Sequence, residues 1–290
     1  MKWLGKNQPC WCKSGKSYGT CHGNFDSILR EYKKRGFMVP KRKIIKNQQQ
    51  LDGIRESGKR NIAILDKVAE KICIGMSTEE INQIVHETTL ALGGIPAPLG
   101  YEGFPKSVCT SINHEVCHGI PSKDVILKEG DIVNVDVSTL YNGYYSDSSR
   151  TFLMGEVSQE KKDLVRVAKE CIDEGLKQVK PWKCMGDMGY AIFDYATKHG
   201  YTVVEDIGGH GIGLEFHEDP YVSYVTQANT EMVMVPGMVF TIEPMINMGT
   251  FEVYVDEENG WTVYTEDHMP SAQWEVMVAV TEEGYEIMAY

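Results

Sequence analysis

Apolar residues recur at helical spacing in several stretches of the chain. Between residues 48 and 73 they fall on one face, and Gly75 is expected to end this helix. Ser77-Thr-Glu-Glu80 then forms a capping box, in which the side chains of the serine and the second glutamate satisfy backbone N–H groups at the start of a helix. Further helices are predicted over residues 158–179 and 187–199.

Alternating apolar and polar residues, typical of half-buried strands, follow in other stretches. Strands are predicted over residues 132–140, 144–153, 238–246, 273–281 and 285–289. Pairs of helices and pairs of strands are interleaved without a regular βαβ rhythm. The pattern therefore predicts an α+β protein with a mainly antiparallel sheet.

One hairpin can be placed to the residue. Asn142-Gly143 lies between two alternating runs and is the strongest short signal for a two-residue type I′ turn. Such a turn sets Asp136 opposite Ser149 and Asp147 opposite Ser138. Because directly opposed residues share a face of the sheet, both aspartates are expected on the same side.

Composition and charge limit the number of domains, the cellular compartment and the kinds of partner, but they do not identify a function. The chain has 290 residues, of which 42% are apolar, enough for one large domain with a small appendage. It shows no apolar run of about 18 residues and no signal peptide, so we expect a cytoplasmic protein. Residues 1–50 carry a balance of +10 and the remainder −22, which gives −12 overall. A basic arm on an acidic body suggests contact with an anionic partner, although a solvated linker is equally consistent.

The first residues hold a compact set of metal-ligand types. Three thiols and one imidazole are a complete tetrahedral zinc set, and so short a segment would need the metal to fold. The ligands are Cys10, Cys12, Cys21 and His22. Their C-x-C-x8-C-H spacing resembles the SEC-C motif; an exposed redox pair or a disulfide is the alternative. We therefore predict a SEC-C-like zinc module over residues 1–24, a basic linker over 25–47 and a catalytic domain over 48–290.

Four carboxylates and one imidazole lie in distinctive short motifs. The motifs are Asn134-Val-Asp-Val137, Tyr145-Ser-Asp-Ser-Ser149, Gly208-Gly-His-Gly-Ile-Gly213, Phe240-Thr-Ile-Glu-Pro244 and Ser271-Ala-Gln-Trp-Glu275. Four clustered carboxylates would repel one another unless positive charge lies among them. Two divalent cations would balance them, which predicts a two-metal hydrolytic site with a bridging hydroxide.

These motifs, in this order, resemble the type I methionine aminopeptidases of the M24, or pita-bread, family. The resemblance extends over about residues 45–290 and includes Cys117-His-Gly-Ile-Pro121 and Phe216-His-Glu-Asp-Pro220. It implies two pseudo-symmetric halves that share a curved antiparallel sheet covered by helices. It also implies a ligand set in which Asp147 and Glu275 bridge two metals, Asp136 completes one ion, and His210 and Glu243 complete the other.

The resemblance further implies the roles of the remaining site residues. Glu243 would shuttle a proton from water to the leaving amine, His217 would polarise the scissile carbonyl, and His118 would contact the amide beyond the cleaved bond. An apolar pocket would hold the side chain of an N-terminal methionine and favour a small second residue. The residues that match this pocket are Tyr101, Phe104, Cys109, Phe216 and Trp261.

Three alternatives compete with this interpretation. His114-Glu-Val-Cys-His118 fits the H-E-x-x-H pattern of zincin proteases, which requires a helix, although Gly119 and Pro121 follow at once. A proline-directed aminopeptidase would share the fold, but Asp206-Ile-Gly-Gly209 stands where those relatives carry an extra histidine. A binding module that has lost catalysis is disfavoured because all five ligands are present.

The metals and partners follow from the same arguments. Four oxygen donors and one nitrogen suit Co, Mn, Fe or Zn at the catalytic site, while the thiol cluster suits one structural zinc. The expected partners are the N-termini of nascent peptides, with no membrane. The basic arm is predicted either to dock on the ribosome or to pack on the body, and the family suggests a monomer.

Overall fold

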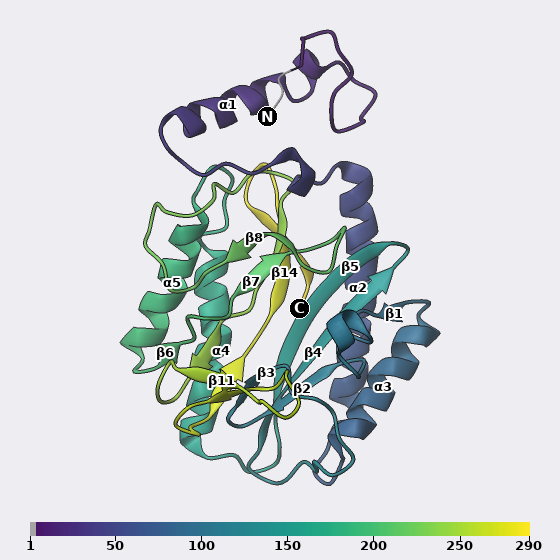
Figure 1. Ribbon diagram of the computed structural model, residues 1–290, viewed down its shortest axis with the longest axis vertical. Coiled ribbons are helices and arrows are strands. Elements are labelled where there is room, and N and C mark those ends of the chain that lie inside the picture. Colours follow the sequence, from purple (N-terminus) through teal and green to yellow (C-terminus); the bar gives the residue numbers. More distant parts are fainter. Residues whose placement is uncertain (1–3) are drawn as a thin grey trace.

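The computed structural model describes residues 4–290, so the first three residues of the predicted zinc module lie outside the described part. Five α-helices are present in that part: α1 (Gly23–Lys34), α2 (Gln48–Lys71), α3 (Thr78–Ala91), α4 (Gln159–Leu176) and α5 (Met185–Lys198). Figure 1 shows α2 and α3 along one side of the strands and α4 with α5 along the other, with α1 across one end. None of the helices within residues 4–290 combines the length and apolar character needed to cross a bilayer.

The predicted helices form, with small shifts at their ends. Ser77 and Glu80 make the predicted capping box at the start of α3, and Asn47 and Gln50 make a second one at the start of α2. The buried face of α2 includes Ile54, Ile64 and Leu65. This helix ends at Lys71, before Gly75, whose φ of 87° belongs to the turn that follows.

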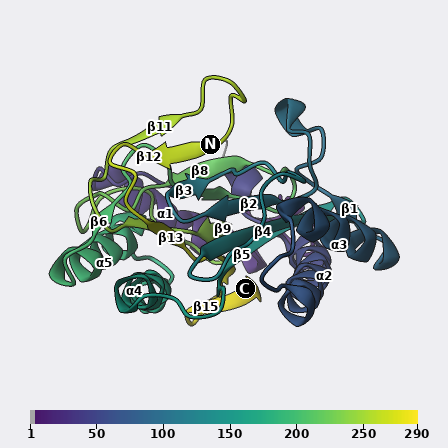
Figure 2. The ribbon, with the colours of Figure 1, turned by 90° about the horizontal axis from the view of Figure 1, so that it is seen from below.

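Within residues 4–290 the strands form four antiparallel sheets. One contains β1 (Ile95–Pro96), β2 (Cys109–Ile112), β4 (Ile132–Tyr141) and β5 (Tyr144–Leu153). The largest contains β7 (Gly209–Gly211), β8 (Glu218–Val222), β9 (Val239–Ile242), β14 (Val276–Val280) and β15 (Tyr285–Ala289). Two smaller sheets contain β6 (Thr202–Val203), β10 (Met245–Asn247) and β13 (Ser271–Gln273), and β3 (Glu115–Cys117), β11 (Val253–Val255) and β12 (Val263–Thr265). Viewed from below in Figure 2, β2, β4 and β5 lie between the β11–β12 hairpin and helices α4 and α2.

The central hairpin has the predicted register. Asp136 lies opposite Ser149 and Ser138 opposite Asp147, with Asn142 and Gly143 both at positive φ in the turn. Ser149 also pairs with Glu275, through backbone hydrogen bonds of 3.3 and 3.4 Å. This single bridge joins β5 to the start of β14, so the sheets of the two halves meet at the row of residues that carries the carboxylates.

Two predicted strands are broken where they were expected to be continuous. The stretch 238–246 divides into β9 and β10 at Glu243 and Pro244, and the stretch 273–281 divides into β13 and β14 at Trp274 and Glu275. Proline has no N–H for a strand ladder, and the N–H of Glu243 donates to the Tyr224 hydroxyl at 2.7 Å. The breaks therefore release two acidic side chains from regular pairing.

The segment predicted as a basic linker, residues 25–47, contains all but the first two residues of helix α1 and contacts the body. Leu29, Ile44 and Ile45 are buried in the same core as α4 and α5. The N–H of Lys46 donates to the carbonyl of Gly237, and the Tyr32 ring stacks on Trp182 with centroids 5.8 Å apart. The arm therefore covers one end of the molecule, as Figure 1 shows.

Candidate active site

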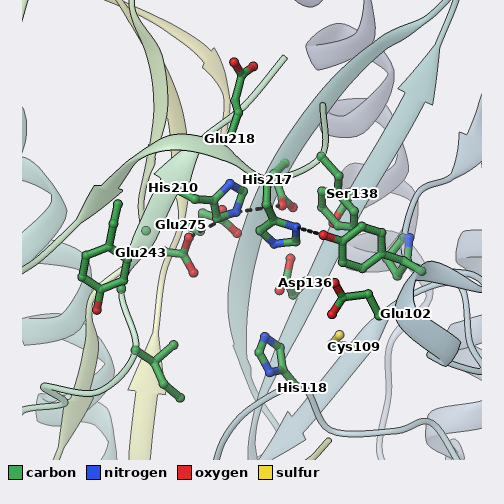
Figure 3. A pocket seen from close by; sticks show the side chains of 18 of the residues that line it. Glu102, Cys109, His118, Asp136, Ser138, His210, His217, Glu218, Glu243 and Glu275 are labelled. Atoms are coloured by element: carbon green, nitrogen blue, oxygen red, sulfur yellow. Dashed lines mark hydrogen bonds and ion pairs between the residues drawn. The ribbon is translucent and has the colours of Figure 1, made fainter. Parts of the chain in front are cut away.

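A cavity of about 760 Å³ opens at the junction of the sheets. All twelve residues predicted for metal binding, catalysis and substrate binding line it. They are Tyr101, Phe104, Cys109, His118, Asp136, Asp147, His210, Phe216, His217, Glu243, Trp261 and Glu275. Residues separated by up to 174 positions in the chain therefore meet in one place, and Figure 3 shows Glu243 and Glu275 beside the His210 ring.

The strand register explains how the carboxylates converge. Asp136 and Asp147 project from the same face of the β4–β5 hairpin, and Glu275 follows on the strand bridged to it. Cys109 on β2 lies opposite Asp136 and extends the same row. One oxygen each of Asp147 and Glu275 and one nitrogen of His210 lie within 4.8 Å of one another, a spacing that one metal ion could span.

His210 and Glu243 are held by their neighbours. The His210 ring shares a hydrogen bond of 3.0 Å between Nδ1 and the carbonyl of Gly211, which leaves Nε2 directed at the carboxylates. This Nε2 lies 3.7 Å from Glu243 and 3.9 Å from Asp147. The Thr241 hydroxyl donates to Glu243 at 2.6 Å and accepts from the backbone N–H of His210. Thr241 therefore links the two sides of the ligand set.

The electrostatics of the cluster fit bound cations. Burial raises the pKa of Asp136 to about 6 and that of Glu243 to about 8. Burial, reinforced by the neighbouring carboxylates, raises the pKa values of Asp147 and Glu275 well above their ordinary range. Burial also lowers the pKa of His210 to about 3, so its ring is a neutral donor.

Two of the carboxylate oxygens have no hydrogen-bond partner among residues 4–290. These buried atoms are Oδ1 of Asp136 and Oδ1 of Asp147. An unpartnered buried carboxylate oxygen is costly, and a cation is the partner that would satisfy it. The donor set of four carboxylates and one neutral imidazole therefore fits divalent metal ions.

Two further histidines face the carboxylates. In Figure 3, Asp136 is drawn between His217 and His118. His217 shares a hydrogen bond of 3.0 Å between Nδ1 and the Tyr101 hydroxyl. Burial lowers the pKa of His118 to about 4 and also lowers that of His217. Both rings are therefore neutral at pH 7 and offer an N–H to a substrate.

Aromatic rings form the apolar wall of the cavity. Phe104 and Trp261 meet edge to face with centroids 5.2 Å apart, and Tyr101 meets Phe216 at 4.8 Å. Phe216 also stacks on Tyr145 at 5.8 Å, a residue that sequence reasoning did not select. Burial raises the pKa of the Cys109 thiol well above its ordinary value, so this sulfur is a soft apolar contact.

Sequence reasoning missed several other residues that line the cavity. Ser138 and the pair Glu218 and Asp219 could have been found, from the hairpin register and from the motif that contains His217. Lys43 gave no signal, because it belongs to the segment interpreted as a linker. The other residues not selected are Pro98, Glu102, Asp206, Ile207, Gly208, Gly209 and Tyr221.

The zincin alternative is wrong. Residues 115–117 form strand β3, and both Asn113 and His118 have positive φ values, so no helix presents the two histidines together. His114 instead contacts the rings of Tyr264 and His268. Glu115 accepts a backbone hydrogen bond from Ile112 and is held away from a catalytic role.

The N-terminal cysteines form the second cluster of metal-ligand side chains. Sγ of Cys10 lies 3.1 Å from Nδ1 of His22, and Sγ of Cys12 lies 3.5 Å from Sγ of Cys21. All four ligand atoms lie within 4.8 Å of one another, and none of the thiols is in a disulfide. The arrangement fits a tetrahedral metal ion better than a redox pair.

Comparison with known proteins identifies a family for each part of the chain. Residues 52–282 match the model of metallopeptidase family M24, and residues 7–24 match the SEC-C motif. A methionine aminopeptidase of Chlamydia pneumoniae is 40% identical over 98% of this chain and 98% of its own length. Methionine aminopeptidase A of Synechocystis sp. is 45% identical over 83% of this chain and 95% of its own length.

The fold is also similar to that of a solved methionine aminopeptidase. The crystal structure of methionine aminopeptidase from Rickettsia prowazekii matches with a TM-score of 0.84 and 41% identity, over 87% of this chain and all of that one. The predicted α+β pita-bread architecture, with helices covering antiparallel sheets, is confirmed. The chain belongs to metallopeptidase family M24, among the type I methionine aminopeptidases, and carries an N-terminal SEC-C motif.

Proposed function

We propose that this chain removes the N-terminal methionine from nascent polypeptides whose second residue is small. The observation that carries the proposal is the cavity itself. It combines a cluster of four carboxylates and a neutral imidazole with an adjacent wall of aromatic rings and one buried thiol. An acidic cluster suited to dications beside an apolar pocket is what hydrolysis next to a methionine side chain requires.

The metal ligands in this proposal are Asp136, Asp147, His210, Glu243 and Glu275. When bound, two divalent cations would lower the pKa of a water molecule and polarise the scissile carbonyl. Co, Mn, Fe and Zn all suit four oxygen donors and one nitrogen, and the cellular supply selects among them. Asp147, His210 and Glu275 offer ligand atoms within 4.8 Å of one another, and the resemblance to the family assigns Asp136 and Glu243 to the same set.

The protein groups would move protons and orient the peptide. Glu243 would take a proton from the attacking water and deliver it to the leaving amine. His217 would donate to the carbonyl oxygen as negative charge develops on it. His118 would contact the amide of the second residue from the opposite side of Asp136.

The substrate preference follows from the cavity wall. Phe104, Trp261 and Phe216 offer aromatic faces and edges to a thioether, and Cys109 adds a sulfur contact. The aromatic rings and the carboxylates share one enclosed space, so a bulky second residue would be crowded. Glycine, alanine or serine at the second position fits this space best.

Peptide hydrolysis tests the function directly. Metal-loaded protein is expected to release methionine from Met-Ala-Ser at least about a hundredfold faster, in kcat/KM, than it releases alanine from Ala-Pro-Ser. Quantifying the free amino acid from each peptide measures this ratio. Preference for Ala-Pro-Ser would instead assign the proline-directed activity, and failure to cleave either peptide with any of the four metals would refute both.

The N-terminal cluster of Cys10, Cys12, Cys21 and His22 would bind one structural zinc ion. Among residues 4–24, only Cys10, Cys12 and Tyr18 form the buried cluster of this module, so the metal would supply much of its folding free energy. We expect Cys12→Ser to remove one equivalent of zinc and to make residues 1–24 sensitive to limited proteolysis, while Met-Ala-Ser hydrolysis is retained. Elemental analysis and digestion measure this, with Cys73→Ser, at an exposed cysteine, as the control. Unchanged zinc content would contradict the assignment.

The basic arm would hold the enzyme at the ribosome, where its substrates emerge. The protein would therefore act in the cytoplasm, and it would act as a monomer. Several cationic side chains of the arm are already paired: Arg42 with Asp26, Lys43 with Asp219 and Lys46 with Glu218. Others stay exposed on the module and on α1, namely Lys13, Lys16 and Lys33. These exposed lysines are the candidates for contact with ribosomal RNA.

A charge-reversal experiment tests this docking. Replacing Lys13, Lys16 and Lys33 together with glutamate is expected to reduce co-sedimentation with ribosomes at low salt, while turnover of Met-Ala-Ser stays unchanged. The matched control replaces three exposed lysines of the body, Lys71, Lys123 and Lys180, and alters net charge equally. An equal loss of ribosome co-sedimentation in both triple variants would show a general charge effect. Unchanged co-sedimentation of the arm variant would contradict docking through these lysines.

A further inference from the structure

The loop that carries His217 is tied to the N-terminal arm by a buried ion pair. Nζ of Lys46 lies 2.8 Å from Oε1 of Glu218, the residue directly after His217. The Lys46 side chain is 0% exposed and that of Glu218 is 10% exposed. Lys46 lies just before helix α2, 171 residues from His217, in a segment with no role in the chemistry described so far.

The contacts of Glu218 show what the pair does to the loop. Oε1 of Glu218 also accepts the backbone N–H of Leu214 at 3.1 Å, so one carboxylate oxygen closes the turn between residues 214 and 218. His217 lies within that turn, directly before Glu218, and the centroid of its ring lies 4.1 Å from that of the His210 ring. The ammonium of Lys46 therefore orients the oxygen that closes the turn.

The stem of Lys46 supports the other end of the same turn. A Cβ on Gly213 would lie 3.4 Å from Cε of Lys46, so the lysine packs directly beneath this glycine. Gly213 has a φ of 126°, which favours glycine, and its carbonyl accepts the N–H of Tyr145 on β5. Lys46 thus contacts both ends of the turn, while its own N–H is bonded to Gly237.

We propose that Lys46 is a positioning residue for catalysis, which holds His217 at the scissile carbonyl through Glu218. The proposal rests on the function proposed above. His217 would stabilise charge that develops in the transition state, and such stabilisation depends on the placement of the donor to a fraction of an ångström. Without the ammonium of Lys46, the turn of residues 214–218 could shift and move the His217 imidazole away from the scissile carbonyl.

A cycle of variants tests the coupling in metal-loaded, full-length protein with Met-Ala-Ser. K46M and E218Q are each expected to lower kcat about tenfold while KM stays within about twofold, because the lost interaction acts in the transition state. In the H217A background, K46M is expected to change kcat by less than about twofold, since its effect passes through His217. K59M, which breaks the exposed pair with Glu56 on α2, is the matched control and should retain wild-type kcat.

Stability is separated from positioning by the double variant K46M/E218Q. It leaves no unpaired buried charge, so it should unfold near the wild-type temperature even where a single variant is destabilised. Its kcat is nevertheless expected to stay low. Wild-type kcat in folded K46M/E218Q, or an equal fall on adding K46M to H217A, would overturn the proposal.

Two other results separate this proposal from the proposed function. If H217A retains wild-type kcat, the coupling through His217 fails while methionine removal stands. If the wild-type protein releases no methionine from the peptide, the function itself fails.

Discussion

Replacing Asp147 with asparagine is expected to lower kcat/KM for Met-Ala-Ser by about a thousandfold, because loss of a metal ligand removes several kcal/mol of transition-state stabilisation. Asp147 is buried, and its Oδ1 has no hydrogen-bond partner among residues 4–290. Asparagine has nearly the same shape, but it lacks the charge and replaces one ligating oxygen with an NH2 group. Metal titration of peptide hydrolysis, with elemental analysis of the purified protein, measures both effects.

The Asp147→Asn variant is expected to lose activity but to gain stability when no metal is bound. Without metal, removing one of four mutually repelling carboxylates should raise the unfolding temperature relative to metal-free wild type at pH 8. Asp124→Asn, at an exposed loop position outside the cavity, is the control and should change neither quantity. Full activity and unchanged metal content in Asp147→Asn would contradict the ligand assignment.

Raising the pH is expected to destabilise the metal-free protein. Each carboxyl of the cluster has a higher pKa in the folded state than in the unfolded chain, so the folded state binds protons more tightly. That stabilisation is complete below the unfolded pKa, near about 4, and is lost as pH rises through the folded values. The folded values are about 6 for Asp136 and about 8 for Glu243. Unfolding temperature should therefore fall between pH 7 and pH 9, above the range in which His118, His210 and His217, whose pKa values are lowered, change charge.

Bound cations should remove this dependence, because they replace protons as the partners of the carboxylates. Ions that bind only the folded state, at a thousandfold above Kd, contribute about 4 kcal/mol, or roughly 10 °C for a chain of this size. Thermal unfolding with excess metal and with excess chelator, across the pH range, measures the difference. Glu243→Gln should weaken the dependence in the metal-free protein. A metal-free unfolding temperature that stays constant or rises with pH would be inconsistent with the cluster.

Features that depend on residues close together in the chain could be predicted from the sequence. The Asn142-Gly143 turn, with the alternation beside it, was enough to place Asp136 opposite Ser149 and Asp147 opposite Ser138. The capping box of Ser77 and Glu80 was visible for the same reason, since each feature depends on residues close in the chain. The N-terminal thiols and imidazole could be grouped by spacing alone, and their ligand atoms do converge.

The remaining site residues were selected by resemblance, and the physical basis of their motifs appears only in the structure. Thr241 bonds both His210 and Glu243, and Gln273 donates to Glu243 at 3.3 Å. The strand breaks at Glu243 and Glu275 were not predicted, because apolar alternation continues through both. They depend on a Tyr224 hydroxyl and on a bridge to Ser149, which lie far away in sequence.

The sequence by itself determined the hairpin register, the starts of helices α2 and α3 and the grouping of the N-terminal thiols and imidazole, while resemblance supplied the rest of the acidic cluster. Only the tertiary structure decided that the basic arm forms part of the catalytic cavity, with Lys43 at its wall and Lys46 beneath the His217 loop. Local features follow from turn geometry and hydrogen bonding between near neighbours. The partner of a lone lysine is decided by packing between segments about 170 residues apart, and no periodicity or spacing in the chain records that choice.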